Sequence, residues 1–152
     1  MEQTENSVGK SYAYEIKGGV PLKGDIDISG SKNAALGVIA ASIMVDGVCT
    51  LENVPDILDV HVMFDLLRSL GATVDAIDNH TYRINPTTIN TYKASGPLVS
   101  RIRASYYLMG ALLGRCGKAS IRLPGGCNFG QRPIDLHLKA FPLIGAKGAR
   151  PP

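Results

Sequence analysis

The chain has 152 residues, of which 45% are hydrophobic and 19% are charged, a composition typical of a globular protein that buries a core. Its formal net charge of +3, without a cluster of lysine or arginine, argues against nucleic-acid binding. Three cysteines without a CxxC pair argue against a disulfide framework and against a zinc site. The polar N-terminus lacks a signal peptide and the longest apolar stretch is too short for a membrane span, so we expect a cytoplasmic protein with no membrane contact.

The first predicted elements follow a polar N-terminus. Residues 1–12 are expected to form a flexible leader. Gly24–Ser29 alternates apolar and polar residues, which predicts a half-buried strand. Ser31 is placed to cap a helix over Lys32–Met44, and this helix is apolar on nearly every face. Such a composition predicts a largely buried helix.

A strand, an amphipathic helix and a hairpin are predicted next. Val48–Glu52 has the pattern of a short strand, and Gly71 provides a C-terminal cap for a helix over Ile57–Leu70. Thr73–Ile77 and Thr81–Ile84 are expected to pair as a hairpin. The residues at helical spacing in the amphipathic helix are Leu58, Val62, Met63, Leu66, Leu67 and Leu70.

The second half of the chain repeats this order of elements. A helix is expected over Val99–Leu113, a strand over Lys118–Leu123, and a further helix that Pro133 opens at its first position. The helix end at Gly71 has a counterpart at Gly145, 74 positions later. The segments Lys32–Ala35 and Ile102–Ser105 are likewise related, at an offset of 70. We therefore predict an α/β fold of duplicated units, the alternative being coincidence between two ordinary helix ends.

A glycine-rich loop around Cys127 is the strongest chemical signal. Glycines at 125, 126 and 130 leave the backbone around this cysteine open to a ligand. Arg132 and the start of the following helix favour the thiolate of Cys127. The alternative is an inert, buried cysteine beside a tight turn.

Three motifs together connect the chain to a known family. They are Pro124–His137, Ile28–Leu36 with its Lys32-Asn33 pair, and Arg103–Ser105 between them. In this order they resemble the UDP-N-acetylglucosamine 1-carboxyvinyltransferases, and the resemblance extends from about Tyr14 to Ala146. It implies an enolpyruvyl transferase-like, inside-out α/β barrel of repeated units, with helices inside and sheets outside. The related shikimate-pathway transferases resemble the chain less, because they have no such cysteine loop.

The resemblance also implies a domain organisation. Residues 13–146 would form the repeated α/β units of the enolpyruvyl transferase-like domain, truncated after about two units, and residues 147–152 would form a tail. Pro142 is expected to disturb the last turns of its helix, because proline lacks a donor and its ring clashes with the preceding turn.

The family's functional residues transfer to matching positions of this sequence. Cys127 corresponds to the catalytic proton donor, which is also the residue that fosfomycin alkylates. Lys32, Asn33 and Arg132 correspond to the residues that bind phosphoenolpyruvate. A lysine at a helix start can bind an anion together with free backbone N–H groups, although the helix dipole by itself disfavours a cation there. The positions that correspond to the binding site for UDP-N-acetylglucosamine are Arg103, Arg132, Pro133, Ile134, Asp135 and Leu136.

The implied reaction transfers the enolpyruvyl group of phosphoenolpyruvate to the 3-hydroxyl of UDP-N-acetylglucosamine and releases phosphate, the first committed step of peptidoglycan synthesis. No metal or cofactor is implied. The family's second domain, which contributes essential residues, has no match here, so we expect the isolated chain to be inactive. The alternative is a noncatalytic sugar-nucleotide-binding or interaction domain. Without a third unit, apolar faces should remain uncovered and promote self-association.

Overall fold

The computed structural model of the chain describes residues 15–122 and 134–148. The predicted leader, most of the predicted tail, Leu123 and much of the cysteine loop lie outside the described residues. The elements in chain order are α1 (Lys32–Ser42), β1 (Cys49–Leu51), α2 (Leu58–Ser69), β2 (Thr73–Ala76), β3 (Tyr82–Asn85), β4 (Lys93–Ala94), α3 (Pro97–Arg101), a 3-10 turn η1 (Arg103–Tyr106), α4 (Tyr107–Cys116), β5 (Ser120–Ile121) and α5 (Asp135–Leu143).

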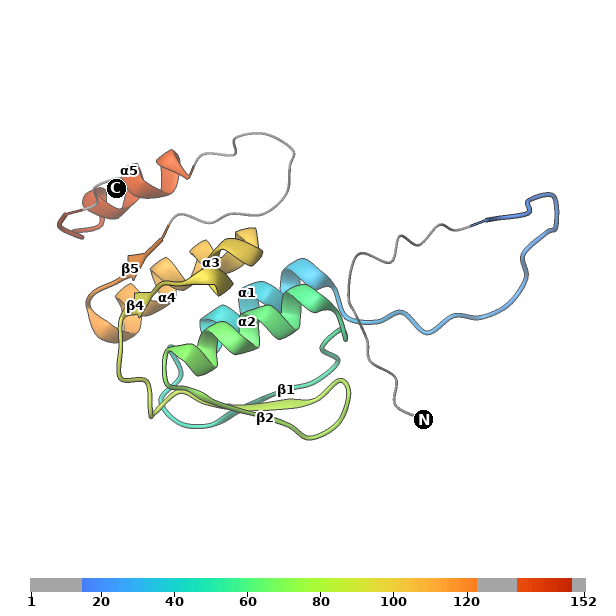
Figure 1. The fold of residues 1–152 in the computed structure, drawn as a ribbon, viewed down its shortest axis with the longest axis horizontal. Helices are drawn as coiled ribbons and strands as arrows, with labels where there is room; N and C mark the ends of the chain where they lie inside the picture. Colours follow the sequence, from blue (N-terminus) through green and yellow to red (C-terminus); the bar gives the residue numbers. More distant parts are fainter. Residues whose placement is uncertain (1–14, 123–133, 149–152) are drawn as a thin grey trace, which may run out of the picture.

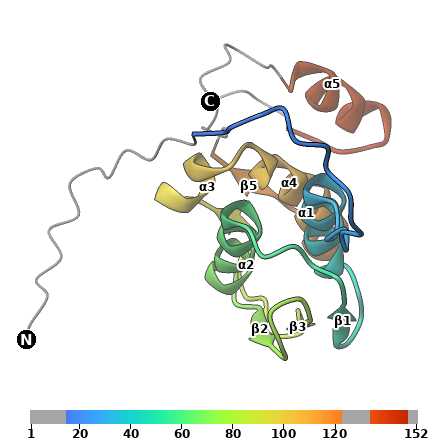
Figure 2. The ribbon, with the colours of Figure 1, turned by 90° about the vertical axis from the view of Figure 1, so that its right-hand side faces the viewer.

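Helices occupy the centre of the molecule, and a sheet covers them on one side. Figure 2 shows α1 and α2 between the three-stranded sheet and the layer that contains α3 and α4. Ile39 of α1, Ile43 just after its end, and Met63 and Leu67 of α2 belong to one hydrophobic core, and all four side chains are fully buried. Burial of a large aliphatic side chain contributes about 1.5–3 kcal/mol, so this helix–helix contact supplies much of the driving force for folding.

The sheet has strand order β1-β3-β2 and is antiparallel throughout. In β3, Tyr82 and Ile84 face the helices while Arg83 between them is exposed, as the side-chain period of a strand requires. Ile84 pairs with Cys49 of β1 on one side and with Val74 of β2 on the other. The predicted strand over Val48–Glu52 and the predicted hairpin are both confirmed.

The two helix ends of the predicted repeat share one backbone geometry. After α2, Gly71 has φ +102° and donates its N–H to Arg68 O at 2.9 Å, while Ala72 donates to Leu67 O at 3.1 Å. After α5, Gly145 has φ +96° and donates to Pro142 O at 3.1 Å, while Ala146 donates to Phe141 O at 3.0 Å. Both ends therefore form the Schellman motif, in which glycine adopts the left-handed conformation. Pro142 is tolerated within the last turn of α5.

The predicted helix over Val99–Leu113 is wrong in one respect, because the chain breaks it into α3, η1 and α4. Ile102 is extended (φ −131°, ψ 138°), although its side chain is buried. The hydroxyl of Ser105 donates to the carbonyl oxygens of Val99 and Ile102, both at 2.9 Å. The Ser105 hydroxyl thus satisfies the carbonyl of Val99, within α3, and that of Ile102, just after it. Neither carbonyl then needs a helical N–H partner, so α3 can end here.

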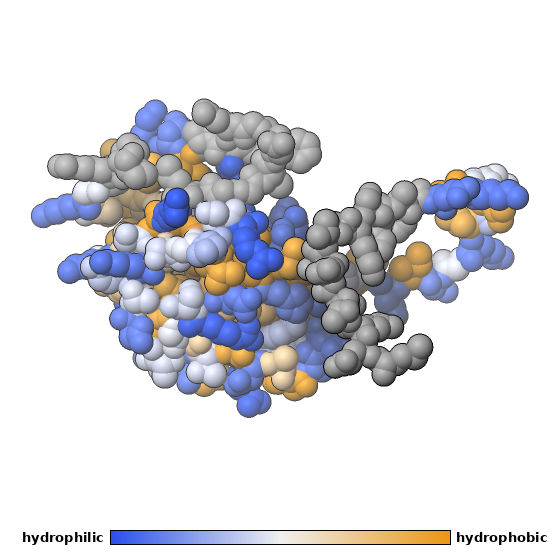
Figure 3. Space-filling view, viewed as in Figure 1, coloured by the Kyte–Doolittle hydropathy of each residue, from blue (hydrophilic) through white to orange (hydrophobic). Residues whose placement is uncertain are grey.

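The predicted strand at Gly24–Ser29 does not form. Residues 15–30 extend away from the body as an arm, which Figure 1 shows in blue. Ile26 and Ile28 are 88% and 91% exposed, so the alternating pattern has no partner strand or core to pack against. Figure 3 shows the apolar patches that this arm carries.

Several predicted boundaries and exposures also change. Helix α1 ends at Ser42, and it buries one face rather than its whole circumference, since Val38 is 51% exposed. Leu58, one of the predicted core-facing residues, is exposed at the first position of α2. Helix α5 begins at Asp135, two residues later than the predicted start at Pro133.

Candidate functional site

The predicted site residues that the structure describes lie at, or a few residues before, the N-terminal ends of helices that point in one direction. Figure 1 shows α1, α2, α4 and α5 running the same way, with their N-termini at the right-hand end of the body. Lys32 and Asn33 begin α1, Arg103 precedes α4, and Asp135 and Leu136 begin α5. Helix N-termini carry a partial positive charge and free N–H groups, so this end of the molecule favours anions.

Lys32 is held by a carboxylate from the neighbouring helix. Its Nζ lies 3.0 Å from Oδ2 of Asp59, in the first turn of α2, and the two side chains are 52% and 37% exposed. Helix α1 has no acidic residue in its first turn, and the side chain of Ser31 makes no capping hydrogen bond, contrary to the prediction that Ser31 caps the helix. Asp59 therefore offsets the unfavourable interaction of Lys32 with the helix dipole. An anion that binds the Lys32 ammonium would therefore compete with the Asp59 carboxylate for it.

Gly30 fixes the entry into α1. A Cβ atom at this position would lie 2.0 Å from the carbonyl oxygen of Asn53 and 3.3 Å from Cδ of Pro55. Only glycine permits so close an approach between two backbones. The glycine of the Ile28–Leu36 motif thus places the start of α1, and with it Lys32, against the loop that precedes α2.

Arg103 faces an aromatic cluster. Its guanidinium carbon is 5.8 Å from the ring centroid of Tyr106, a cation–π distance. The Tyr106 ring is 4.7 Å from that of Tyr107 and 5.3 Å from that of His137, both edge to face. Burial raises the pKa of Tyr106, a hydrogen bond with Tyr107 and the charge of Tyr107 raise it further, and the positive charge of Arg103 opposes these effects. The cluster thus connects Arg103 with α5.

The described part of the last motif consists of Ile134, Asp135 and Leu136. Ile134 is buried, whereas Leu136 is 73% exposed and Asp135 pairs with Lys139 of the next turn at 3.6 Å. Cys127, Arg132 and Pro133 lie outside the described residues, so their predicted roles remain predictions. Among the residues 15–122 and 134–148, no hydrogen bond or ion pair joins Lys32, Arg103 and Asp135 to one another.

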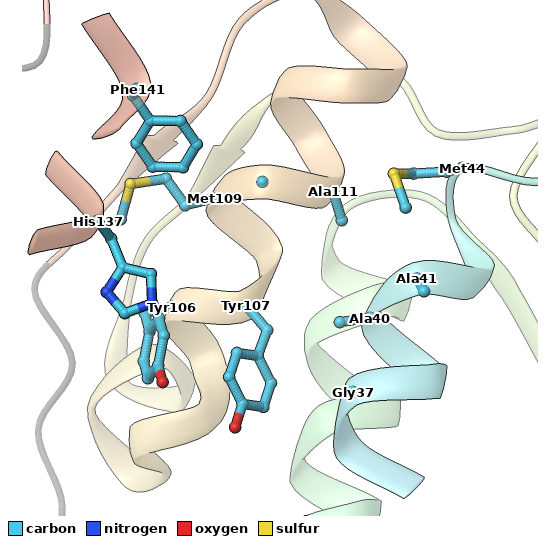
Figure 4. Close-up of a pocket in the computed structure, with 11 residues that line it drawn as sticks. Gly37, Ala40, Ala41, Met44, Tyr106, Tyr107, Met109, Ala111, His137 and Phe141 are labelled. Carbon is cyan, nitrogen blue, oxygen red and sulfur yellow. The ribbon is translucent and has the colours of Figure 1, made fainter. Parts of the chain in front are cut away.

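A cavity of about 360 Å³ is lined by residues of α1, α4 and α5 and by Tyr106, the aromatic partner of Arg103. Figure 4 shows its α1 side opposite α4, with His137 and Phe141 of α5 beyond α4. Its walls are almost entirely apolar, so it does not have the charge that a phosphate needs. The lining residues are Gly37, Ala40, Ala41, Met44, Tyr106, Tyr107, Met109, Gly110, Ala111, His137 and Phe141.

Two residues that sequence reasoning missed contribute to the site, Asp59 and Tyr106. Asp59 is 27 positions from Lys32, and no local pattern indicates that the two meet. Tyr106 follows the Arg103–Ser105 motif directly, yet its contact with His137 depends on where α5 packs. Within the described ranges, no three His, Cys, Asp or Glu side chains gather as a metal site would require, and no helix is long and apolar enough to cross a membrane.

Comparison with known proteins agrees with the motifs. The sequence model of EPSP synthase (3-phosphoshikimate 1-carboxyvinyltransferase) matches residues 16–149. The chain belongs to the EPSP synthase family. Within the family, the chain is 43% identical over 134 residues to UDP-N-acetylglucosamine 1-carboxyvinyltransferase 3 of Caldanaerobacter subterraneus. It is 48% and 49% identical, each over 133 residues, to the enzymes named UDP-N-acetylglucosamine 1-carboxyvinyltransferase in Wolbachia pipientis and Clostridium botulinum.

These matches cover 84–88% of the chain but only 31–32% of the relatives, so the chain spans about a third of their length. Among solved structures, the enolpyruvyl transferase NikO from Streptomyces tendae superimposes with a TM-score of 0.58 at 29% identity. That superposition covers 64% of this chain and 23% of NikO. The predicted fold class, an enolpyruvyl transferase-like α/β fold, is thus confirmed.

Proposed function

We propose that this chain provides substrate-binding residues for the transfer of an enolpyruvyl group from phosphoenolpyruvate to the 3-hydroxyl of UDP-N-acetylglucosamine, with release of phosphate. The observation that carries the proposal is that Lys32, Arg103 and Asp135 lie at helix N-termini that point the same way. The names of relatives 43–49% identical to the chain support the choice of substrates. On the sequence grounds given above, the proposed place of action is the cytoplasm.

The proposed roles follow from charge. Lys32, Asn33 and Arg132 bind the phosphate and carboxylate of phosphoenolpyruvate. Their positive charge and hydrogen bonds stabilise the charge that develops as the hydroxyl oxygen attacks the substituted carbon of the enol. Asp59 keeps the Lys32 ammonium in place when no anion is present and gives up part of this contact when one binds.

In the same proposal, the thiol form of Cys127 donates a proton to the methylene carbon of phosphoenolpyruvate as the carbon–oxygen bond forms, and the hydroxyl proton passes to a base of the family's second domain. Loss of phosphate together with a proton from that carbon then restores the double bond in the product. Arg103 and the residues Arg132, Pro133, Ile134, Asp135 and Leu136 hold the sugar nucleotide. Arginine suits this task because its guanidinium can bind a phosphate through two N–H donors.

The isolated chain should bind the nucleotide weakly and show no turnover, because it spans a third of its relatives. Titration with UDP-N-acetylglucosamine followed by NMR should shift resonances of residues at the helix N-termini. Arg103→Ala should weaken this binding about tenfold, whereas Lys118→Ala, an exposed lysine beyond the C-terminal end of α4, should leave it unchanged. Absence of binding by the unaltered chain would refute the proposed nucleotide site.

Thiol reactivity tests the proposed role of Cys127. Burial raises the pKa of Cys49, against weaker opposing hydrogen bonds, so this half-buried thiol should react slowly with iodoacetamide. Cys116 is exposed, so its labelling rate shows how fast an accessible but unactivated thiol reacts. Cys127 should be labelled faster than both. Peptide mapping that finds Cys116 labelled first would contradict an activated Cys127.

In the full-length enzyme we expect fosfomycin to alkylate Cys127, and Cys127→Asp to give resistance.

The alternative function is a noncatalytic sugar-nucleotide-binding or interaction domain, and exposed apolar surface favours an interaction role. Val38, Met44 and Val45 of the α1 region are 51%, 52% and 40% exposed. We propose that the chain self-associates through this surface, since large exposed apolar patches usually mark contacts. Light scattering should find species larger than the monomer, and Val38→Gln should shift them toward it. A stable monomer across the accessible concentrations would refute self-association.

Phosphate release that depends on both substrates would rule out the noncatalytic alternative.

A further inference from the structure

Helix α5 carries predicted binding residues, yet it lies exposed on the surface of the molecule. None of its nine residues is buried, and its apolar side chains Leu136 and Leu143 are 73% and 87% exposed. Two of its contacts with the helical body are those of His137, which meets Tyr106, and of Phe141, which lines the cavity beside α4. Because little apolar area of α5 is buried, these contacts, together with the buried Ile134 just before the helix, fix where its first turn lies.

Tyr106 touches Arg103 of the predicted nucleotide site and also His137, which directly follows the predicted site residues Asp135 and Leu136. One contact is with Arg103, whose guanidinium carbon lies 5.8 Å from the ring centroid. The other is with His137, whose ring lies 5.3 Å away at an interplanar angle of 64°. Arg103 and His137 are distant in sequence, and the cysteine loop lies between them. Figure 4 shows Tyr106 and His137 together at one end of the cavity, while Tyr107 lies between Tyr106 and α1.

We infer that Tyr106 is a positioning residue, which holds α5 against Arg103 so that Arg103 and the first turn of α5 face the same sugar nucleotide. This inference rests on the proposed function. A tyrosine ring suits the task because its face attracts a cation and its edge-to-face packing with a second ring has a defined geometry. It also has only two side-chain torsions to fix. Tyr107 does not have this role, because it is 37% exposed and lines the cavity on the side of α1.

The geometric part of the inference can be tested without a ligand. The chain has three histidines, and NMR of their labelled rings should show ring-current shifts for His137 that the exposed His61 lacks. Tyr106→Leu should remove these shifts, while Tyr106→Phe, which keeps the ring, should retain them. Tyr92→Leu is the matched control, since Tyr92 is 38% exposed and contacts its neighbour Lys93. If Tyr106→Leu leaves the His137 shifts unchanged, Tyr106 does not hold α5.

The functional part requires the affinity of each variant for UDP-N-acetylglucosamine. Tyr106→Leu should weaken binding about tenfold, Tyr106→Phe less than twofold, and Tyr92→Leu not at all. Arg103→Ala and Tyr106→Leu should be non-additive when combined, because both act through one geometry. A purely structural residue would instead lower stability without such coupling, so additive effects on affinity would overturn the inference.

Two results separate this inference from the proposed function. If the unaltered chain shows the His137 ring shifts but does not bind the nucleotide, the proposed function fails, and Tyr106 still positions α5. If the unaltered chain binds the nucleotide, and Arg103→Ala shows the expected loss of affinity while Tyr106→Leu shows none, the positioning role fails and the proposed function stands. Should Tyr106→Leu not fold, His137→Leu removes the same ring contact, and His137 is exposed, so this variant should still fold. His137→Leu should show the loss of nucleotide affinity expected for Tyr106→Leu.

Discussion

The two repeated units of this chain share local structure but differ in burial. The first unit (residues 31–85) and the second unit (residues 93–146) each contain a helix, a strand and a helix that ends in a Schellman motif at glycine. At equivalent positions of the two final helices, Leu70 is 0% exposed while Ile144 is 77% exposed. The same local sequence signal thus ends a core helix in one unit and a surface helix in the other.

The difference teaches that the repeat determines secondary structure, whereas the surroundings determine what each copy contributes to stability. Helix α2 packs against α1 and lies over a three-stranded sheet. Helix α5 has the cavity and the aromatic cluster beside it, and none of its nine residues is buried. Stability should therefore concentrate in the first unit, while α5 remains the element that a ligand or another surface can still move.

The largest expected effect separates the two helix ends directly. Leu70→Ala should reduce the free energy of unfolding by about 2–5 kcal/mol, because it opens a cavity in the core. Ile144→Ala, the matched variant in the second unit, should change it by less than about 0.5 kcal/mol. Urea unfolding followed by circular dichroism measures both. Equal losses would mean that α5 is as well packed as α2.

A second variant tests how the first unit is assembled. Gly30→Ala should cost about 1–3 kcal/mol of unfolding free energy, because its Cβ would lie 2.0 Å from the backbone oxygen of Asn53. Gly18→Ala in the arm is the control, since nothing lies within 4 Å of its Cβ position. The control should leave the unfolding midpoint unchanged. An unaffected Gly30→Ala variant would show that the α1 entry is not packed as described.

Arg115 joins the two units, and its removal tests how strongly they depend on each other. Its Nη1 donates to the carbonyl oxygens of Ile43 at 2.8 Å and Val45 at 3.2 Å, just after α1. Arg115→Ala should lower the free energy of unfolding by about 1–2 kcal/mol, since hydrogen bonds from charged donors exceed neutral ones. Hydrogen exchange should accelerate in α4 more than in α2. Faster exchange confined to α2 would contradict the described connection.

The smallest expected effects concern the two ion pairs at helix starts. Lys32–Asp59 connects two helices at 3.0 Å, whereas Asp135–Lys139 lies within α5 at 3.6 Å. Both are exposed, so double-mutant cycles with Lys32→Ala and Asp59→Asn, or with the α5 pair, should give coupling energies of at most about 1 kcal/mol. The Lys32 pair should have the larger coupling, and 0.5 M NaCl should weaken both. A larger coupling in α5 would reverse the ranking.

The sequence by itself determined most of the local structure and the family. Hydrophobic periodicity located α2, and the glycines at 71 and 145 marked helix ends that proved equivalent. The order of the three motifs led to the family, which the comparison then showed. These features are local or depend only on order along the chain, so they can be read without knowing which elements pack together.

Only the tertiary structure decided what each pattern packs against. The alternating residues of Gly24–Ser29 predict a strand, but a strand needs a partner, and Ile26 and Ile28 face solvent instead. The break at Ile102 depends on two hydrogen bonds from the Ser105 hydroxyl. The pairing of Lys32 with Asp59, and of Tyr106 with His137, joins residues from different helices. Such contacts depend on helix packing, which no local sequence period specifies.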